Sequence, residues 1–144
     1  MSFQWLQMRI SEENDRRRRE RAAIERLPSA FEDLRQQLEA CIQTFRKAFG
    51  EEAASIVKDG SKLRVTSRDE RNGVWTPSQK VEIISVAAVP GFQVDRSGEQ
   101  RVVEIGLLPG DKLYYRDRDR DQYISLEELT RLILDRVLFP KLDE

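Results

Sequence analysis

The chain has 144 residues and a formal net charge of −1, with 25 Lys and Arg residues against 26 Asp and Glu residues. It contains no histidine and one cysteine, Cys41, which excludes imidazole-based acid–base catalysis, Ser–His and Cys–His nucleophile pairs, intramolecular disulfides and thiolate metal clusters. With 39% hydrophobic and 35% charged residues, the composition is that of a soluble globular protein, and the length predicts one domain over residues 1–144.

A helical front is predicted over residues 11–49. Ser11 has the character of an N-cap, and the charged residues from 12 to 21 place acids and arginines four positions apart, a spacing that supports an exposed helix. Pro28 is expected to kink this helix or to interrupt it with a short break, because proline lacks an amide donor and crowds the preceding turn. The following segment, 29–49, carries apolar residues at steps of three and four and is predicted to pack on the core.

The middle of the chain changes to a period of two, which predicts a four-stranded antiparallel meander over residues 62–116. The separators are rich in Gly, Pro and Asn and are too short for a crossover helix. The alternating residues of the four expected strands are Leu63 and Val65, Val81 and Ile83, Val103 and Ile105, and Leu113 and Tyr115.

A last helix is predicted over residues 125–139. Ser125 and Glu128 form a capping box, and Pro140 ends the helix. The chain is therefore expected to fold as an α+β domain, with the front and last helices packed on the sheet. The last helix is apolar around most of its circumference, more than one sheet contact requires. Either it is sandwiched within the fold, or Leu134 and Leu138 also meet another subunit.

One segment, from residue 117 to residue 128, resembles the calcium-binding loop of the EF-hand family. The resemblance implies an all-oxygen cage that binds calcium, the only cofactor that the sequence suggests. Its ligands would be the side chains of Asp117, Asp119, Asp121 and Glu128 and the carbonyl of Tyr123.

The same loop departs from the EF-hand pattern in three ways. Gln122 stands where the family has glycine, no second loop is present, and Pro109 and Gly110 lie too close upstream for an entering helix. The alternative is a solvated loop whose aspartates pair with the interleaved arginines, while Ser125 and Glu128 serve only the capping box.

An apolar cluster precedes the first predicted helix. It contains Trp5, Leu6, Met8 and Ile10 and has no evident core to join, so it is predicted to dock on a partner or a second copy of the chain. Packing back onto the chain's own sheet is the alternative. A homodimer through this cluster, the first helix or the last helix is the expected assembly.

Other binding classes are disfavoured. The run of arginines at 16–19 is interleaved with acids, which argues against nucleic acid, and no apolar run is long enough to span a membrane. Cys41 lies on an apolar stripe and is predicted to be a core residue rather than a nucleophile. The absence of a signal-peptide pattern and the single cysteine predict a cytoplasmic location.

The sequence thus predicts a non-enzymatic domain that binds a protein partner or a ligand, with a calcium-binding module as the alternative. An enzyme that acts through carboxylates or a Lys/Ser pair is a third hypothesis.

Overall fold

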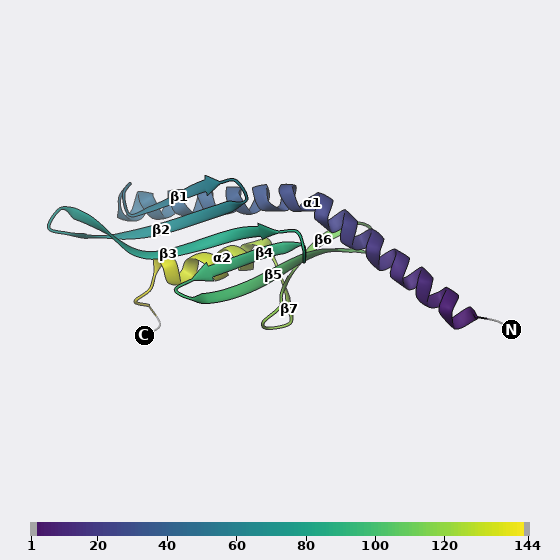
Figure 1. The fold of residues 1–144 in the computed structure, drawn as a ribbon. Coiled ribbons are helices and arrows are strands. Elements are labelled where there is room, and N and C mark those ends of the chain that lie inside the picture. The colour runs from purple at the N-terminus through teal and green to yellow at the C-terminus, as the bar shows by residue number, and fades with distance from the viewer. Residues whose placement is uncertain (1–2, 143–144) are drawn as a thin grey trace.

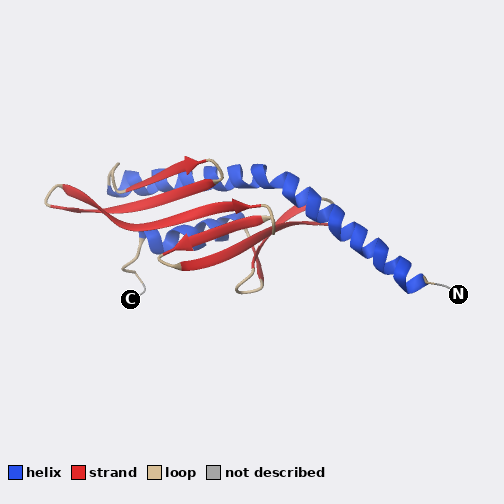
Figure 2. Cartoon of the chain, in the orientation of Figure 1, coloured by secondary structure: helices blue, strands red, loops and turns tan. Residues whose placement is uncertain are grey.

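The computed structural model describes residues 3–142 and has an α+β architecture, in which a helix opens the chain and another closes it. The first, α1 (Gln4–Phe49), has 46 residues, and the last, α2 (Leu126–Leu138), has 13. The part of the chain between the two helices forms one antiparallel sheet (Figure 2). Its strands are β1 (Ala54–Asp59), β2 (Lys62–Arg71), β3 (Val74–Val86), β4 (Gly91–Arg96), β5 (Glu99–Leu108), β6 (Lys112–Asp117) and β7 (Gln122–Ile124). The ends of the predicted 1–144 domain, residues 1–2 and 143–144, lie outside the described residues.

The antiparallel meander is confirmed, but the predicted strand number is wrong, because the sheet has seven strands rather than four. The short strands β1, β4 and β7 were missed. In β4, Phe92 and Val94 alternate as in a strand that faces the core, but turn residues on both sides made this segment resemble a loop. The connections are tighter than expected, since Asn72–Gly73 and Ser97–Gly98 both have positive φ angles. Such pairs form the two-residue turns that match the twist of a hairpin, so full strands fit on either side.

Of the kink or break predicted near Pro28, the break is wrong, because α1 continues through this residue. The helix also begins at Gln4 rather than near Ser11. Proline removes one backbone hydrogen bond from a helix and crowds the turn before it. Leu27 and Ala30, within two positions of Pro28, are only 5% and 1% exposed. Their packing in the core offsets the cost of the proline. Figure 1 shows that α1 changes direction between the part on the sheet and the part that projects.

Replacing Pro28 with alanine is expected to raise the free energy of unfolding by about 1–3 kcal/mol, because a helix-interior proline costs up to about 3 kcal/mol. Urea unfolding followed by circular dichroism would measure the change. A loss of stability would mean that the local geometry of α1 is adapted to the proline.

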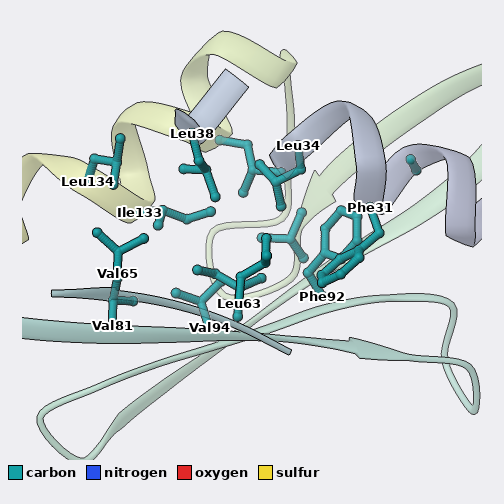
Figure 3. Close-up of a cluster of buried hydrophobic side chains, with 14 of the residues drawn as sticks. Phe31, Leu34, Leu38, Leu63, Val65, Val81, Phe92, Val94, Ile133 and Leu134 are labelled. Carbon is teal, nitrogen blue, oxygen red and sulfur yellow. The ribbon is translucent and has the colours of Figure 1, made fainter. Parts of the chain in front are cut away.

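The hydrophobic core lies between one face of the sheet and the two helices (Figure 3). On the sheet side, Leu63, Val65, Val81, Ile83 and Phe92 are all at most 1% exposed. The predicted capping box of Ser125 and Glu128 is confirmed at the start of α2.

The part of α1 before the core has no such cover. Its first buried residue is Ala23, and the preceding turns extend past the end of the sheet (Figure 1). Within residues 3–142 no helix combines the length and the apolar character that crossing a membrane requires.

Candidate functional site

The residues of the predicted calcium loop do not converge. Asp117 is 1% exposed, and its Oδ1 accepts the Asp119 amide at 3.1 Å. Asp121 pairs with Arg116, and the Glu128 carboxylate accepts the Ser125 amide at 3.2 Å in the capping box. Tyr123 lies on β7, with its side chain 66% exposed.

Residues 118–121 form the turn between β6 and β7, in which the positive φ belongs to Asp121 rather than to Gln122. Among residues 3–142 no group of three or more His, Cys, Asp or Glu side chains is arranged to hold a metal ion. Calcium binding stays a prediction, and the separate engagement of these carboxylates does not favour it.

At one end of the sheet, the face that packs on the core carries charged side chains on three adjacent strands, β4, β5 and β6. The inward rows run from Val94 to Arg96 on β4, from Val103 to Arg101 on β5, and from Tyr115 to Asp117 on β6. The register pairs Val94 with Arg101 and Val103 with Asp117. Arg101 and Asp117 are therefore diagonal neighbours on the face that α2 covers.

A partly open pocket of about 640 Å³ lies at this end, between the sheet and α2. Its lining includes the buried apolar side chains of Val81, Val94 and Ile133. It also includes five arginines and four acids, which leaves one positive charge in excess. The charged lining residues are Arg96, Arg101, Arg120, Arg131, Arg136, Glu99, Asp117, Glu128 and Asp135.

Ion pairs within the pocket are long. Arg101 lies 3.8 Å from Asp117 Oδ2 and 3.7 Å from Asp119, and Arg96 lies 3.4 Å from Glu99. Asp117 Oδ2 is buried without a hydrogen bond among the described residues. A buried carboxylate oxygen without a donor is costly, so this pocket contains an acceptor that the fold does not satisfy.

Sequence reasoning missed this pocket, although a signal was present. Arg101 lies two residues before Val103 and Asp117 two residues after Tyr115, so each has the alternation phase of a core residue. A charged residue in that phase faces inward. Which strands pair, and therefore which charges meet, depends on the register of the sheet.

The predicted interaction residues fall in different environments. Trp5 is 67% exposed and Leu6 is 41% exposed, at the free end of α1. Leu134 is 4% exposed and packs in the core of its own chain, as Figure 3 shows, so it offers no surface to a partner. Leu138 is half-buried and lines an apolar groove of about 380 Å³ with Phe45 and Phe139.

The projecting part of α1 carries one stripe of residues at alternating steps of four and three. Its members are Leu6, Ile10, Glu13, Arg17, Glu20 and Ile24. This spacing is that of a coiled-coil seam, with apolar residues at both ends and charged residues in the middle.

The middle of this stripe is strongly charged. Hydrogen bonds from Arg16 and then Arg17 lower the pKa of Glu13 to about 2, so this carboxylate is ionised at neutral pH. The apolar ends are exposed, at 41% for Leu6, 51% for Ile10 and 38% for Ile24. The stripe is therefore an unpartnered surface with alternating charge.

Cys41 is half-buried and packs against the core. Burial, and secondarily the charge of Glu127, raises the pKa of its thiol. A raised pKa lowers the fraction of reactive thiolate, which favours a packing role over a nucleophilic one.

Comparisons with known proteins add no assignment to these surfaces. No protein-family model matches the chain, and neither the curated proteins nor the solved structures that were compared include a match.

Proposed function

We propose that this protein is a non-enzymatic interaction module that forms a homodimer through the projecting part of α1. The observation that carries the proposal is the exposed apolar end of a helix that has already left its own core. Phe3, Trp5, Leu6, Met8 and Ile10 are each at least 41% exposed there. Such a concentration of apolar surface is typical of a docking site.

A second copy of the chain is the partner that suits the stripe best. In an antiparallel pair centred between residues 13 and 17, Leu6 lies against Ile24 of the second helix, and Glu13 lies against Arg17. Each such contact occurs twice, as a two-fold axis requires. The same register places Ile10 against Glu20, so the apolar match is between Leu6 and Ile24 and the charge match is between Glu13 and Arg17.

The chemistry of the chain is consistent with a binding role. It has no histidine, and the pKa of its single thiol is raised. The reducing environment of the cytoplasm suits a chain with one unpaired cysteine.

The double substitution Leu6→Glu and Ile10→Glu is expected to convert the dimer to a monomer, because it places a charge in the contact between Leu6 and Ile24 and a second carboxylate against Glu20. Light scattering coupled to size exclusion at high micromolar concentration measures the mass. The matched control, Gln4→Glu with Gln7→Glu, adds the same charge to the same turns outside the stripe and is expected to remain dimeric. A wild-type monomer under these conditions would refute the proposal.

Cysteine cross-linking tests the antiparallel arrangement. In a Cys41→Ser background, Leu6→Cys combined with Ile24→Cys is expected to form a covalent dimer on oxidation, since a disulfide requires Cα atoms about 4.4–6.8 Å apart. Leu6→Cys alone is expected not to cross-link. Efficient cross-linking of that single variant would indicate a parallel pair and overturn the arrangement proposed above.

A further inference from the structure

We infer that the pocket between the sheet and α2 binds a small organic anion that carries a hydroxyl or amino donor. The donor would bond to Asp117, and the anionic groups would bind the arginines. This inference does not depend on the homodimer, because the stripe lies on the projecting part of α1 and the pocket has no residue of that helix.

The first argument is the state of the Asp117 carboxylate. Its Oδ1 accepts the Asp119 amide, whereas Oδ2 is buried with no hydrogen bond among the described residues. The nearest cation, Arg101, is 3.8 Å away, which is beyond hydrogen-bond distance. A ligand donor would satisfy this oxygen.

The second argument is the supply of cationic groups. Among the described residues, Arg120, Arg131 and Arg136 have no carboxylate partner within 4.0 Å. Guanidinium groups bind carboxylates and phosphates through paired hydrogen bonds. These arginines are exposed around the pocket, so they are free to turn toward an anion.

The third argument is access to the acceptor. The Arg101 side chain is 31% exposed and is held by ion pairs of 3.7 and 3.8 Å, which are weak at these lengths. Binding requires Arg101 to turn toward the anionic ligand, so that the ligand's donor replaces it beside Asp117 Oδ2. The apolar residues Val81, Val94 and Ile133 then offer contacts for the ligand's carbon skeleton.

Matched pairs of small molecules test the donor. Citrate and tricarballylate share a carbon chain and three carboxylates, but tricarballylate lacks the hydroxyl. Glycerol 3-phosphate and propyl phosphate provide the same comparison for phosphate esters. Calorimetric titration in metal-free buffer at constant ionic strength is expected to give a Kd about tenfold lower for at least one hydroxylated molecule than for its partner. The pair that shows the difference identifies the anion as carboxylate or phosphate.

The variant Asp117→Asn separates this inference from simple attraction of anions to arginine. Its Oδ1 still accepts the Asp119 amide, but its amide nitrogen cannot accept the ligand's proton. We expect the hydroxylated molecule to lose its advantage. Attraction by net charge alone predicts the opposite, tighter binding of both molecules, because the substitution removes a negative charge.

Two further variants complete the design. Arg101→Gln is expected to weaken both members of a pair, whereas Arg9→Gln, at the far end of α1, is expected to change neither Kd. Equal affinities within both pairs, or no binding by any of the four molecules, would overturn the inference. This comparison needs only the wild-type protein, so it holds even if a variant fails to fold.

Discussion

Replacing Leu38 with alanine is expected to lower the free energy of unfolding by about 2–5 kcal/mol, the range for large-to-small substitutions in packed cores. Leu38 is completely buried on the part of α1 that covers the sheet, as Figure 3 shows. Removing its branched end would leave a cavity among Leu34, Ile133 and their neighbours, and the sheet on the other side cannot collapse to fill it. Equilibrium denaturation in urea measures the loss.

Leu6→Ala on the same helix is the matched control. It makes the same chemical change, but Leu6 is 41% exposed at the projecting end. The expected change in the stability of the monomer is within about 0.5 kcal/mol, as for surface positions in general. Similar losses at Leu6 and Leu38 would contradict the division of α1 into a core part and a projecting part. If the protein is a dimer, the Leu6 variant should instead reduce self-association.

Gly91→Ala is expected to destabilise the protein by at least about 3 kcal/mol, at or above the usual range for overpacking. A Cβ atom at this position would lie 2.2 Å from the Val103 carbonyl oxygen and 2.8 Å from the Glu104 Cα. Both atoms belong to the backbone of β5, which pairs with β4 at this point. Relief therefore requires the two strands to separate, because backbone atoms cannot rotate aside. Thermal and urea unfolding would show the loss.

Gly106→Ala provides the comparison that isolates this cause. Its Cβ would lie 2.3 Å from atoms of the Tyr114 ring, a side chain that can rotate away. The expected loss is smaller, about 1–2 kcal/mol. If Gly91→Ala proved the milder of the two, the close approach of β4 and β5 would not be the reason for glycine at that position.

Local signals in the sequence predicted the elements whose stability is local. The capping box of Ser125 and Glu128 identified the start of α2, because its hydrogen bonds join residues three positions apart. The three- and four-residue steps after Pro28 identified the core face of α1, including Leu34 and Leu38. The exposure of Trp5 and Leu6 is consistent with the prediction that this end lacks a core of its own.

Other features arise from interactions between distant residues, which no local pattern contains. Burial of Leu27 and Ala30 keeps α1 continuous through Pro28, against the local preference for a break. Pairing with long neighbours makes strands of β1 and β4, although each has only six residues.

The same distinction holds for the surfaces with proposed functions. The charge and apolar pattern of the stripe on α1 is contained in the sequence, because helical spacing alone places its residues on one side. The pocket is not. Arg101 and Asp117 are brought together by a register that pairs Val103 with Asp117, and residues of α2 line the same pocket. Only tertiary structure decides such a meeting, because a strand register that pairs residues fourteen positions apart is selected by the energy of the whole sheet and core rather than by the residues next to each of them in the sequence.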